Sequence, residues 1–424
     1  MAKTITGKQV GDSYYQVEHP SGLTVLLYPK EHCSTTYAIF GTRYGSIDNC
    51  FQRSDEAGPE SVPEGIAHYL EHKLFESEEG DAFERFSKTG ASANAFTSFE
   101  STCYLFSTTD QVYQSLEILL DFVQSPYFTE ETVRKEQGII GQEIKMYDDD
   151  PQWRVMFNYL KAMYHSHPIR EDIAGTVESI AKITPELLYR CYNTFYNLGN
   201  MVLAIAGNFQ VDKALAVCDK MLKPAAPVTV QRVFPQEPDT IVQPVVEERL
   251  SVASPLFQFG FKEPGADQPR SEKDVAATEV LLETLASDAS PLFRRLLDQG
   301  LVNESSFSYE YFEGNGYATV MFSGESKDPQ AVAQAILEEV ERFQREGIPA
   351  EAFERSKRAL YGELVAALNS TGSIANGLVN MHLKGRELFT YIDSLASLRL
   401  EDGEERLRKV FQRERSVLSV ILPH

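Results

Sequence analysis

Residues 128–143 read FTEETVRKEQGIIGQE, and residues 348–363 read IPAEAFERSKRALYGE. The two stretches align by eye without a gap, and both have the spacing of apolar residues that is typical of a helix. A similar order of strands and helices precedes each of them along the chain. Such self-similarity indicates that one structural unit is duplicated in the chain. The sequence therefore predicts an α+β fold of two homologous α/β domains, each of about 200 residues, with helices and a mostly antiparallel sheet.

The first copy begins with strand-like runs between residues 14 and 48, which are β-branched or aromatic and bounded by turn residues. Helical spacing follows in VPEGIAHYLEHKLF, where a proline just inside the start suits a first helical turn. We further expect a short helix ending at a Gly90 C-cap, strands at NAFTSF and TCYLFST, and helices near residues 110–124 and 129–147. The second copy repeats this order from a strand at residues 255–263 onward.

The segment between the copies, LKPAAPVTVQRVFPQEPDTIVQP at residues 222–244, is rich in proline and has little helical pattern. Such a composition suits an extended linker. We therefore expect an N-terminal domain at residues 1–222, a linker at residues 223–244 and a C-terminal domain of the same fold at residues 245–424. The two domains would close as a clamshell.

The chain of 424 residues contains 40 Lys and Arg against 62 Asp and Glu, which gives a formal net charge of −22. Such an acidic chain is a poor partner for nucleic acid or an anionic membrane surface. Its five cysteines are widely spaced with no CxxC pair, which argues against a disulfide framework. The N-terminal residues lack the apolar core of a signal peptide, and no run of about 18 apolar residues predicts a membrane helix. We expect a protein of the reducing cytoplasm.

The segment HYLEH, from His68 to His72, places two histidines one helical turn apart on one face, so that both imidazoles can reach one ion. Zinc in catalytic sites usually has three protein ligands and one open position, and it lowers the pKa of a bound water to about 7. Glu71 lies beside the pair and can take a proton from that water. Two such histidines alone are more often ordinary helix residues, so the interpretation depends on a third ligand.

The best source of a third ligand is the helix expected near residues 129–147. Its Glu136 and Glu143 are seven residues apart and therefore share a face after two turns. A carboxylate among apolar neighbours needs a partner such as a metal or a base. The histidines of HSHP, His165 and His167, are a rival metal tract, but they lack periodic carboxylates nearby and predict a polar loop.

The order H-x-x-E-H, followed about seventy residues later by E-x6-E, is similar to the pitrilysin, insulysin and mitochondrial processing peptidase family of inverzincins. The run GASANAFTSFESTCYLFS, the duplication and the proline-rich linker extend this resemblance over essentially the whole chain. The resemblance implies that Zn²⁺ is held by His68, His72 and Glu143. It also implies that Glu71 is the general base and that Glu136 orients a ligand.

The same resemblance implies that an extended peptide substrate joins an edge strand at Asn94, Ala95 and Phe96 through main-chain hydrogen bonds. This mode of binding reads the extended shape of a peptide more than its sequence. The second copy has VAATEVLLETLA in the place of the two histidines. If the copies are duplicates, only the first could hold a metal.

Active single-chain members of this family carry an arginine and a tyrosine seven residues apart in the C-terminal half, which hold the substrate carbonyl and its developing oxyanion. Aligned on Gly300-Leu301, this chain has Leu296, or Leu297 with a small shift, and Asn303 at those positions. The nearby residues with suitable side chains have the wrong spacing: Arg294, Arg295, Tyr309 and Tyr311.

The resemblance therefore implies a zinc-dependent endopeptidase that hydrolyses peptides or unfolded segments with metal-activated water. Because the Arg/Tyr pair is missing, we expect this chain to be the catalytic subunit of a paired assembly, either a homodimer or a heterodimer with a related subunit that lacks zinc. The alternative is a non-catalytic scaffold or peptide-binding subunit of a processing-peptidase-like complex. Retention of zinc distinguishes the two, because a scaffold need not hold the metal.

Overall fold

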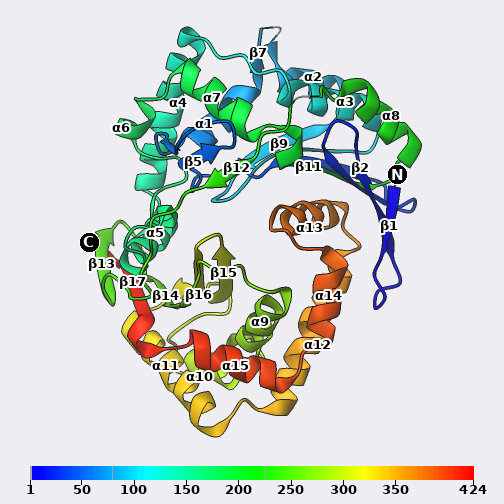
Figure 1. Ribbon diagram of the computed structural model, residues 1–424. Helices are drawn as coiled ribbons and strands as arrows, with labels where there is room; N and C mark the ends of the chain where they lie inside the picture. The colour runs from blue at the N-terminus through cyan, green and yellow to red at the C-terminus, as the bar shows by residue number, and fades with distance from the viewer. Residues whose placement is uncertain (1, 79, 225) are drawn as a thin grey trace. The chain divides into compact units, whose positions relative to one another are not determined.

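The structure is a computed structural model that describes residues 2–78, 80–224 and 226–424. The chain divides into two compact units, each assembled from three separate stretches of sequence. Unit 1 comprises Met1–Ile144, Glu171–Val233 and Val365–Thr390, and unit 2 comprises Lys145–Arg170, Phe234–Leu364 and Tyr391–His424. Figure 1 labels the helices and strands of both units.

Unit 1 is built on a seven-stranded sheet with the order β1-β2-β3-β11-β4-β10-β9. Its strands are β1 (Ala2–Thr6), β2 (Ser13–Glu18), β3 (Thr24–Pro29), β4 (Thr36–Thr42), β9 (Ser92–Thr97), β10 (Thr102–Thr108) and β11 (Met201–Gly207). β3 and β11 are parallel, and all other neighbours in this sheet are antiparallel. Short strands form two smaller sheets: β5 (Cys50–Arg53), β6 (Glu60–Ser61) and β12 (Val230–Arg232), and β7 (Glu76–Ser77) with β8 (Gly80–Asp81).

Helices cover both faces of the unit 1 sheet. The helices of unit 1 are α1 (Ile66–Leu74), α2 (Ala82–Thr89), α3 (Val112–Val123), α4 (Glu130–Asp148), α6 (Val177–Ile180), α7 (Pro185–Phe195), α8 (Val211–Met221) and α13 (Thr371–Leu383), with a short 3₁₀ turn η2 (Leu198–Asn200). Figure 1 shows α13 on the face of the sheet opposite to α2, α3 and α8. Every residue of the central strand β11 is buried, because helices lie on both of its sides.

Unit 2 is built on a five-stranded sheet with the order β13-β17-β14-β16-β15. Its strands are β13 (Val245–Leu250), β14 (Leu256–Lys262), β15 (Ser308–Gly314), β16 (Tyr317–Glu325) and β17 (Ser416–Pro423). Its helices and 3₁₀ turns are α5 (Pro151–Met163), η1 (Pro168–Arg170), α9 (Glu272–Ala286), α10 (Pro291–Asp298), α11 (Pro329–Glu346), α12 (Ala350–Ala367), α14 (Leu388–Ala396), α15 (Leu400–Val410) and η3 (Arg413–Arg415). Helices α12 and α14 extend a few residues into the stretch assigned to unit 1.

The two units repeat one strand pattern, as the duplicated sequence predicts. In unit 1, β3 is parallel to β11, and β4, β10 and β9 follow in antiparallel order; in unit 2, β13 is parallel to β17, and β14, β16 and β15 follow. The helix that follows α4 in the first copy, α5, packs on β13, β17 and β14 of unit 2. Its counterpart in the second copy, α13, packs on β3, β11 and β4 of unit 1. In each unit, a helix from the other sequence copy therefore packs on the sheet.

Most elements agree with the expectation from the sequence, and the α+β fold is confirmed. Helix α2 ends at Gly90, which has a φ of 72° and donates its backbone N–H to the carbonyl oxygens of Phe86 and Ser87. The segment at residues 222–244 contains the short strand β12, which pairs with β5. The continuous boundaries at residues 222/223 and 244/245 remain predictions, as does the clamshell closure.

Candidate metal centre

Helix α1 carries three of the predicted site residues, and a glycine fixes where it begins. Gly65, the N-cap, has a φ of 84°, in the left-handed region that favours glycine. A Cβ atom at this position would lie 2.3 Å from the carbonyl oxygen of Ala174, so a side chain would require a shift of the backbone. The helix begins at Ile66. Pro63 therefore precedes α1, which corrects the expectation that this proline lies inside its first turn.

The two histidines of α1 meet a glutamate of α4. Nε2 of His68 lies 3.7 Å from Oε1 of Glu143, and Nε2 of His72 lies 3.4 Å from Oε2 of the same carboxylate. The possible ligand atoms of these three residues all lie within 4.8 Å of one another. Tyr69 connects the two helices, because its hydroxyl donates a hydrogen bond to the carbonyl oxygen of Val133 on α4. Two helices far apart in sequence thus bring three possible metal ligands close together.

The residues of this cluster fit a zinc ion. Two ligands that are each about 2.1 Å from a tetrahedral zinc ion stand roughly 3.4 Å apart. Nε2 of His72 and Nε2 of His68 lie at 3.4 Å and 3.7 Å from the Glu143 oxygens, so small movements would bring all three onto one ion. Burial, together with the charge of His72, lowers the pKa of His68 to about 4. This imidazole is therefore neutral near pH 7, the form that binds a metal.

Glu136 holds the other nitrogen of His72. Its Oε1 lies 3.0 Å from Nδ1 of His72. Because a carboxylate only accepts, Nδ1–H donates, and the lone pair of Nε2 is left facing Glu143. Burial lowers the pKa of His72, but the hydrogen bond to Glu136 and the charge of Glu143 outweigh it and raise the pKa above its usual range. These carboxylates therefore stabilise a positive charge at this point.

Glu71 lies beside the cluster and is held by a strand. Oγ1 of Thr97, at the end of β9, donates a hydrogen bond of 2.6 Å to Oε2 of Glu71. Burial raises the pKa of the Glu71 carboxyl above its ordinary value, although the hydrogen bond from Thr97 and the charge of His72 act in the opposite direction. A partly buried carboxylate beside a group of possible metal ligands could act as a general base.

The residues expected to bind substrate lie on β9. Among the described residues, β9 is an edge strand of the unit 1 sheet and has β10 as its neighbour. Asn94 and Phe96 are exposed, and Phe96 keeps 40% of its surface accessible. Ala95 is half-buried and points to the other face of the sheet. The strand therefore offers a free edge beside α1, against which it packs.

The positions at which the family carries arginine and tyrosine lie in unit 2. Leu296 on α10 has no exposed surface, and Asn303 lies in the exposed segment that follows this helix. Arg294 is exposed, and Nη1 of Arg295 lies 3.4 Å from a carboxylate oxygen of Glu339. Leu296 is therefore a core residue and Asn303 a loop residue. The two arginines are ordinary residues of helix α10.

Two nearby tyrosines already have partners. The hydroxyl of Tyr311 donates a hydrogen bond of 2.6 Å to Glu263, and only 8% of Tyr311 is exposed. The hydroxyl of Tyr309 donates to Glu283. Neither hydroxyl is free to donate to a substrate oxyanion without breaking a hydrogen bond to a carboxylate, which is stronger than a neutral one.

The segment HSHP, the other candidate metal site in the sequence, makes hydrogen bonds within the protein instead. His165 is exposed, as a polar loop predicts, but His167 is only 1% exposed, so that expectation was wrong for His167. Its Nε2 lies 2.9 Å from the carbonyl oxygen of Asn315, and its Nδ1 accepts from the backbone N–H of Ile169. The Glu237 carboxylate accepts from the backbone N–H groups of residues 165–167. Both ring nitrogens of His167 are thus used by the protein.

Thr97 and Tyr69 are the residues that the sequence did not identify. Each acts across elements, since Thr97 of β9 reaches Glu71 on α1 and Tyr69 of α1 reaches α4. The alternating pattern of β9 could have indicated which way Thr97 points. Thr97 lies two positions after Ala95, so both side chains lie on the half-buried face of the strand.

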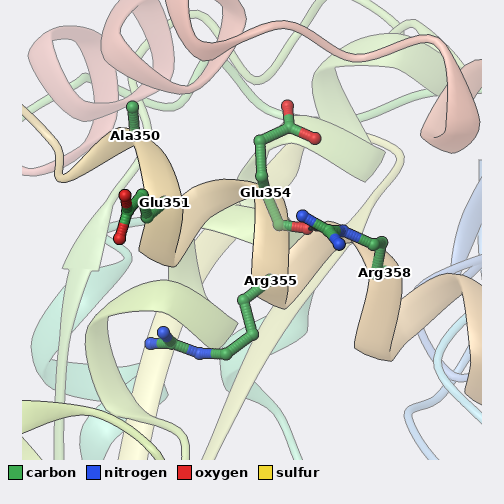
Figure 2. A pocket seen from close by; sticks show the side chains of 5 residues that line it. All are labelled: Ala350, Glu351, Glu354, Arg355 and Arg358. Atoms are coloured by element: carbon green, nitrogen blue, oxygen red, sulfur yellow. Dashed lines mark hydrogen bonds between the residues drawn. The ribbon is translucent and has the colours of Figure 1, made fainter.

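Other features of the chain lie apart from this cluster. A cavity of about 720 Å³ is lined by Ala350, Glu351, Glu354, Arg355 and Arg358. Figure 2 shows that all five side chains come from successive turns of one helix, α12 of unit 2, and none belongs to the cluster on α1 and α4. The described structure leaves its five cysteines free, and none of its helices is long and apolar enough to cross a membrane.

The chain belongs to peptidase family M16. Residues 60–177 match the family described as insulinase (peptidase family M16), and residues 182–360 match the family described as peptidase M16 inactive domain. A protein of Bacillus subtilis (strain 168) described as uncharacterized zinc protease YmfH is 39% identical over 428 residues, which cover 100% of both chains.

Two further comparisons agree with this membership. The crystal structure of an M16-like peptidase from Alicyclobacillus acidocaldarius has a TM-score of 0.92 at 36% sequence identity, and the match covers 100% of this chain and 98% of that one. A protein of Arabidopsis thaliana described as probable mitochondrial-processing peptidase subunit beta is 24% identical over 344 residues, which cover 77% of this chain and 63% of that protein. These similarities support a peptidase function.

Proposed function

We propose that this protein is a zinc-dependent endopeptidase that cleaves peptides or unfolded segments. The observation that carries the proposal is the convergence of Nε2 of His68 and Nε2 of His72 on the two oxygens of Glu143, at 3.7 Å and 3.4 Å. The description of the Bacillus subtilis relative as a zinc protease supports the choice of metal. Bound by these three residues, a zinc ion would supply the Lewis acidity that activates the attacking water.

The chain's own residues would do the remaining work. Glu71 would accept the proton of the attacking water and later deliver it to the leaving nitrogen. Glu136 would keep Nδ1–H of His72 in place, so that its Nε2 keeps a lone pair for the metal. At the edge of β9, the main chain around Asn94, Ala95 and Phe96 would pair with an extended substrate and hold its backbone next to Glu71.

We further propose that this chain is the catalytic subunit of a pair. Leu296 and Asn303 supply no donor for the oxyanion, and the hydroxyls of Tyr309 and Tyr311 are bound to carboxylates of unit 2. A related subunit without zinc would supply the missing arginine and tyrosine, whereas a second copy of this chain would have to complete the site with other residues. The free cysteines are compatible with the reducing cytoplasm as the place of action.

Zinc content and peptide hydrolysis, measured on the same preparation, test the proposal. The purified protein should hold about one zinc ion per chain and cleave an unstructured peptide in the presence of its partner. Glu71→Gln should retain the zinc and lose the hydrolysis. A protein without zinc that binds peptides but does not cleave them would instead identify a scaffold subunit.

A further inference from the structure

The carboxylate of Glu71 is attached to the edge strand rather than to its own helix. Oγ1 of Thr97 donates to its Oε2 at 2.6 Å. Thr97 is the last residue of β9, and α1 packs against this strand. This short hydrogen bond therefore limits the directions in which the Glu71 carboxylate can point.

Thr97 pairs with a buried residue on the neighbouring strand. Its strand partner across the ladder is Thr102 on β10, which has no exposed surface. Oγ1 of Thr102 donates a hydrogen bond of 2.9 Å to the carbonyl oxygen of Tyr44 and lies 3.3 Å from Oγ1 of Thr97. Threonine also has few side-chain rotamers, because two heavy atoms branch at its Cβ. The strand pairing and the restricted rotamers of threonine therefore limit the positions that this hydroxyl can take.

We propose that Thr97 is a positioning residue that clamps Oε2 of Glu71 at the end of β9 and so leaves Oε1 to accept the proton of the attacking water. A glutamate side chain has three rotatable bonds, and each orientation away from the water lowers the fraction of productive encounters. A short hydrogen bond to a carboxylate is among the stronger ones in proteins. The same contact places the general base at the strand that the substrate would join.

This inference rests on the proposed function, since it assigns Thr97 a role toward the proposed general base. The test compares Thr97→Val, which keeps the branched shape and removes the hydroxyl, with Thr97→Ser, which keeps the hydroxyl. Thr97→Ala is a second variant without the hydroxyl, in case valine disturbs the strand. Ser92→Ala is the matched control, because Ser92 is exposed at the other end of β9.

Loss of a hydrogen bond to a charged group corresponds to about a 10- to 100-fold change. We expect Thr97→Val to lower kcat by this factor, with KM within about twofold of the wild type and unchanged zinc content. Thr97→Ser should restore most of the rate, and Ser92→Ala should behave as the wild type. An unchanged kcat in Thr97→Val, or a Thr97→Ser protein as slow as Thr97→Val, would overturn the proposal.

A crystal structure of the Thr97→Val protein gives a second readout that does not depend on turnover. The Glu71 carboxylate should leave its position or adopt several orientations, whereas Thr97→Ser should retain it. A Glu71 carboxylate that keeps its place without the hydroxyl would overturn the positioning role even if the enzyme is inactive. Failure of the wild-type protein to cleave any peptide in the presence of its partner contradicts the proposed function alone.

Discussion

Nδ1 of His72 and Oε1 of Glu136 lie 3.0 Å apart, while Nε2 of the same ring faces Glu143 at 3.4 Å. One imidazole therefore connects two glutamates that are two turns apart on α4. Under the proposed function, Glu143 would hold the metal and Glu136 would orient the ring of His72.

Glu136→Gln should weaken zinc binding by about 10-fold, because a neutral amide accepts from Nδ1–H less strongly than a carboxylate and lowers the basicity of Nε2. The dissociation constant can be measured by competition with a chromophoric chelator. Glu131→Gln, at an exposed position of the same helix, should leave zinc affinity unchanged. Equal affinities for wild type and Glu136→Gln would contradict the orienting role.

Glu143→Gln and Glu71→Gln should separate metal binding from catalysis. The first removes a ligand and should lower zinc occupancy, whereas the second removes only a proton acceptor and should lower the rate by about 10²–10⁴-fold with full zinc content. Metal analysis after dialysis, together with a peptide cleavage assay, checks both. Normal zinc content in Glu143→Gln would rule out this residue as the third ligand.

The isolated protein should cleave an unstructured peptide slowly or not at all, because an oxyanion without a donor costs roughly 3 kcal/mol, or about 10²-fold in rate. Adding a zinc-less relative that carries the arginine and tyrosine should raise the rate by that factor. Mutation of that tyrosine in the partner should remove the gain. Full activity from a verified single-chain preparation, unchanged by any partner, would refute the division between two subunits.

The stability of unit 2 should fall with acid because of His167. Burial lowers the pKa of this histidine to about 4, against 6.5 for an unperturbed side chain. Between these pH values the unfolded chain binds a proton that the folded chain does not, so stability is present above pH 6.5 and is lost as the pH falls toward 4. The full effect is about 3 kcal/mol.

The urea midpoint of unfolding at pH 7.5 and at pH 5 measures this loss. His167→Gln should be less stable at pH 7.5 but should lose less between the two pH values than the wild type. His165→Gln, at an exposed position two residues away, should keep the wild-type difference. If His167→Gln shows the same acid dependence as the wild type, another group is responsible.

Gly65→Ala should destabilise unit 1 and weaken zinc binding, because an alanine Cβ would meet the carbonyl oxygen of Ala174 at 2.3 Å and the residue would need a φ of 84°. Gly90→Ala is the matched control, since Gly90 also has a positive φ but open space around it. The control should lose only the conformational cost of about 1–2 kcal/mol. Thermal unfolding and zinc affinity distinguish them, and equal losses in both variants would show that the contact with Ala174 is unimportant.

The local elements follow from the sequence, because their signals are local. Gly90 ends α2 where a left-handed residue is required, and the helical spacing around residues 130–148 gives α4 almost to the residue. The start of α1 was misplaced, since Pro63 is a favourable first-turn residue in general. Here Gly65 begins the turn, because the packing against Ala174 admits no side chain.

The duplication and the helical pair His68 and His72 could be predicted from the amino-acid sequence, because repeats and helical spacing are properties of the linear chain. Helical spacing offered both Glu136 and Glu143 as a third ligand, and the family resemblance favoured Glu143. Three features came from the three-dimensional structure alone: α5 and α13 pack on the sheets of the opposite copies, His167 is buried, and Thr97 donates a hydrogen bond to Glu71. Each of these depends on contacts between residues far apart along the chain, and no local propensity encodes which distant partner a side chain will meet.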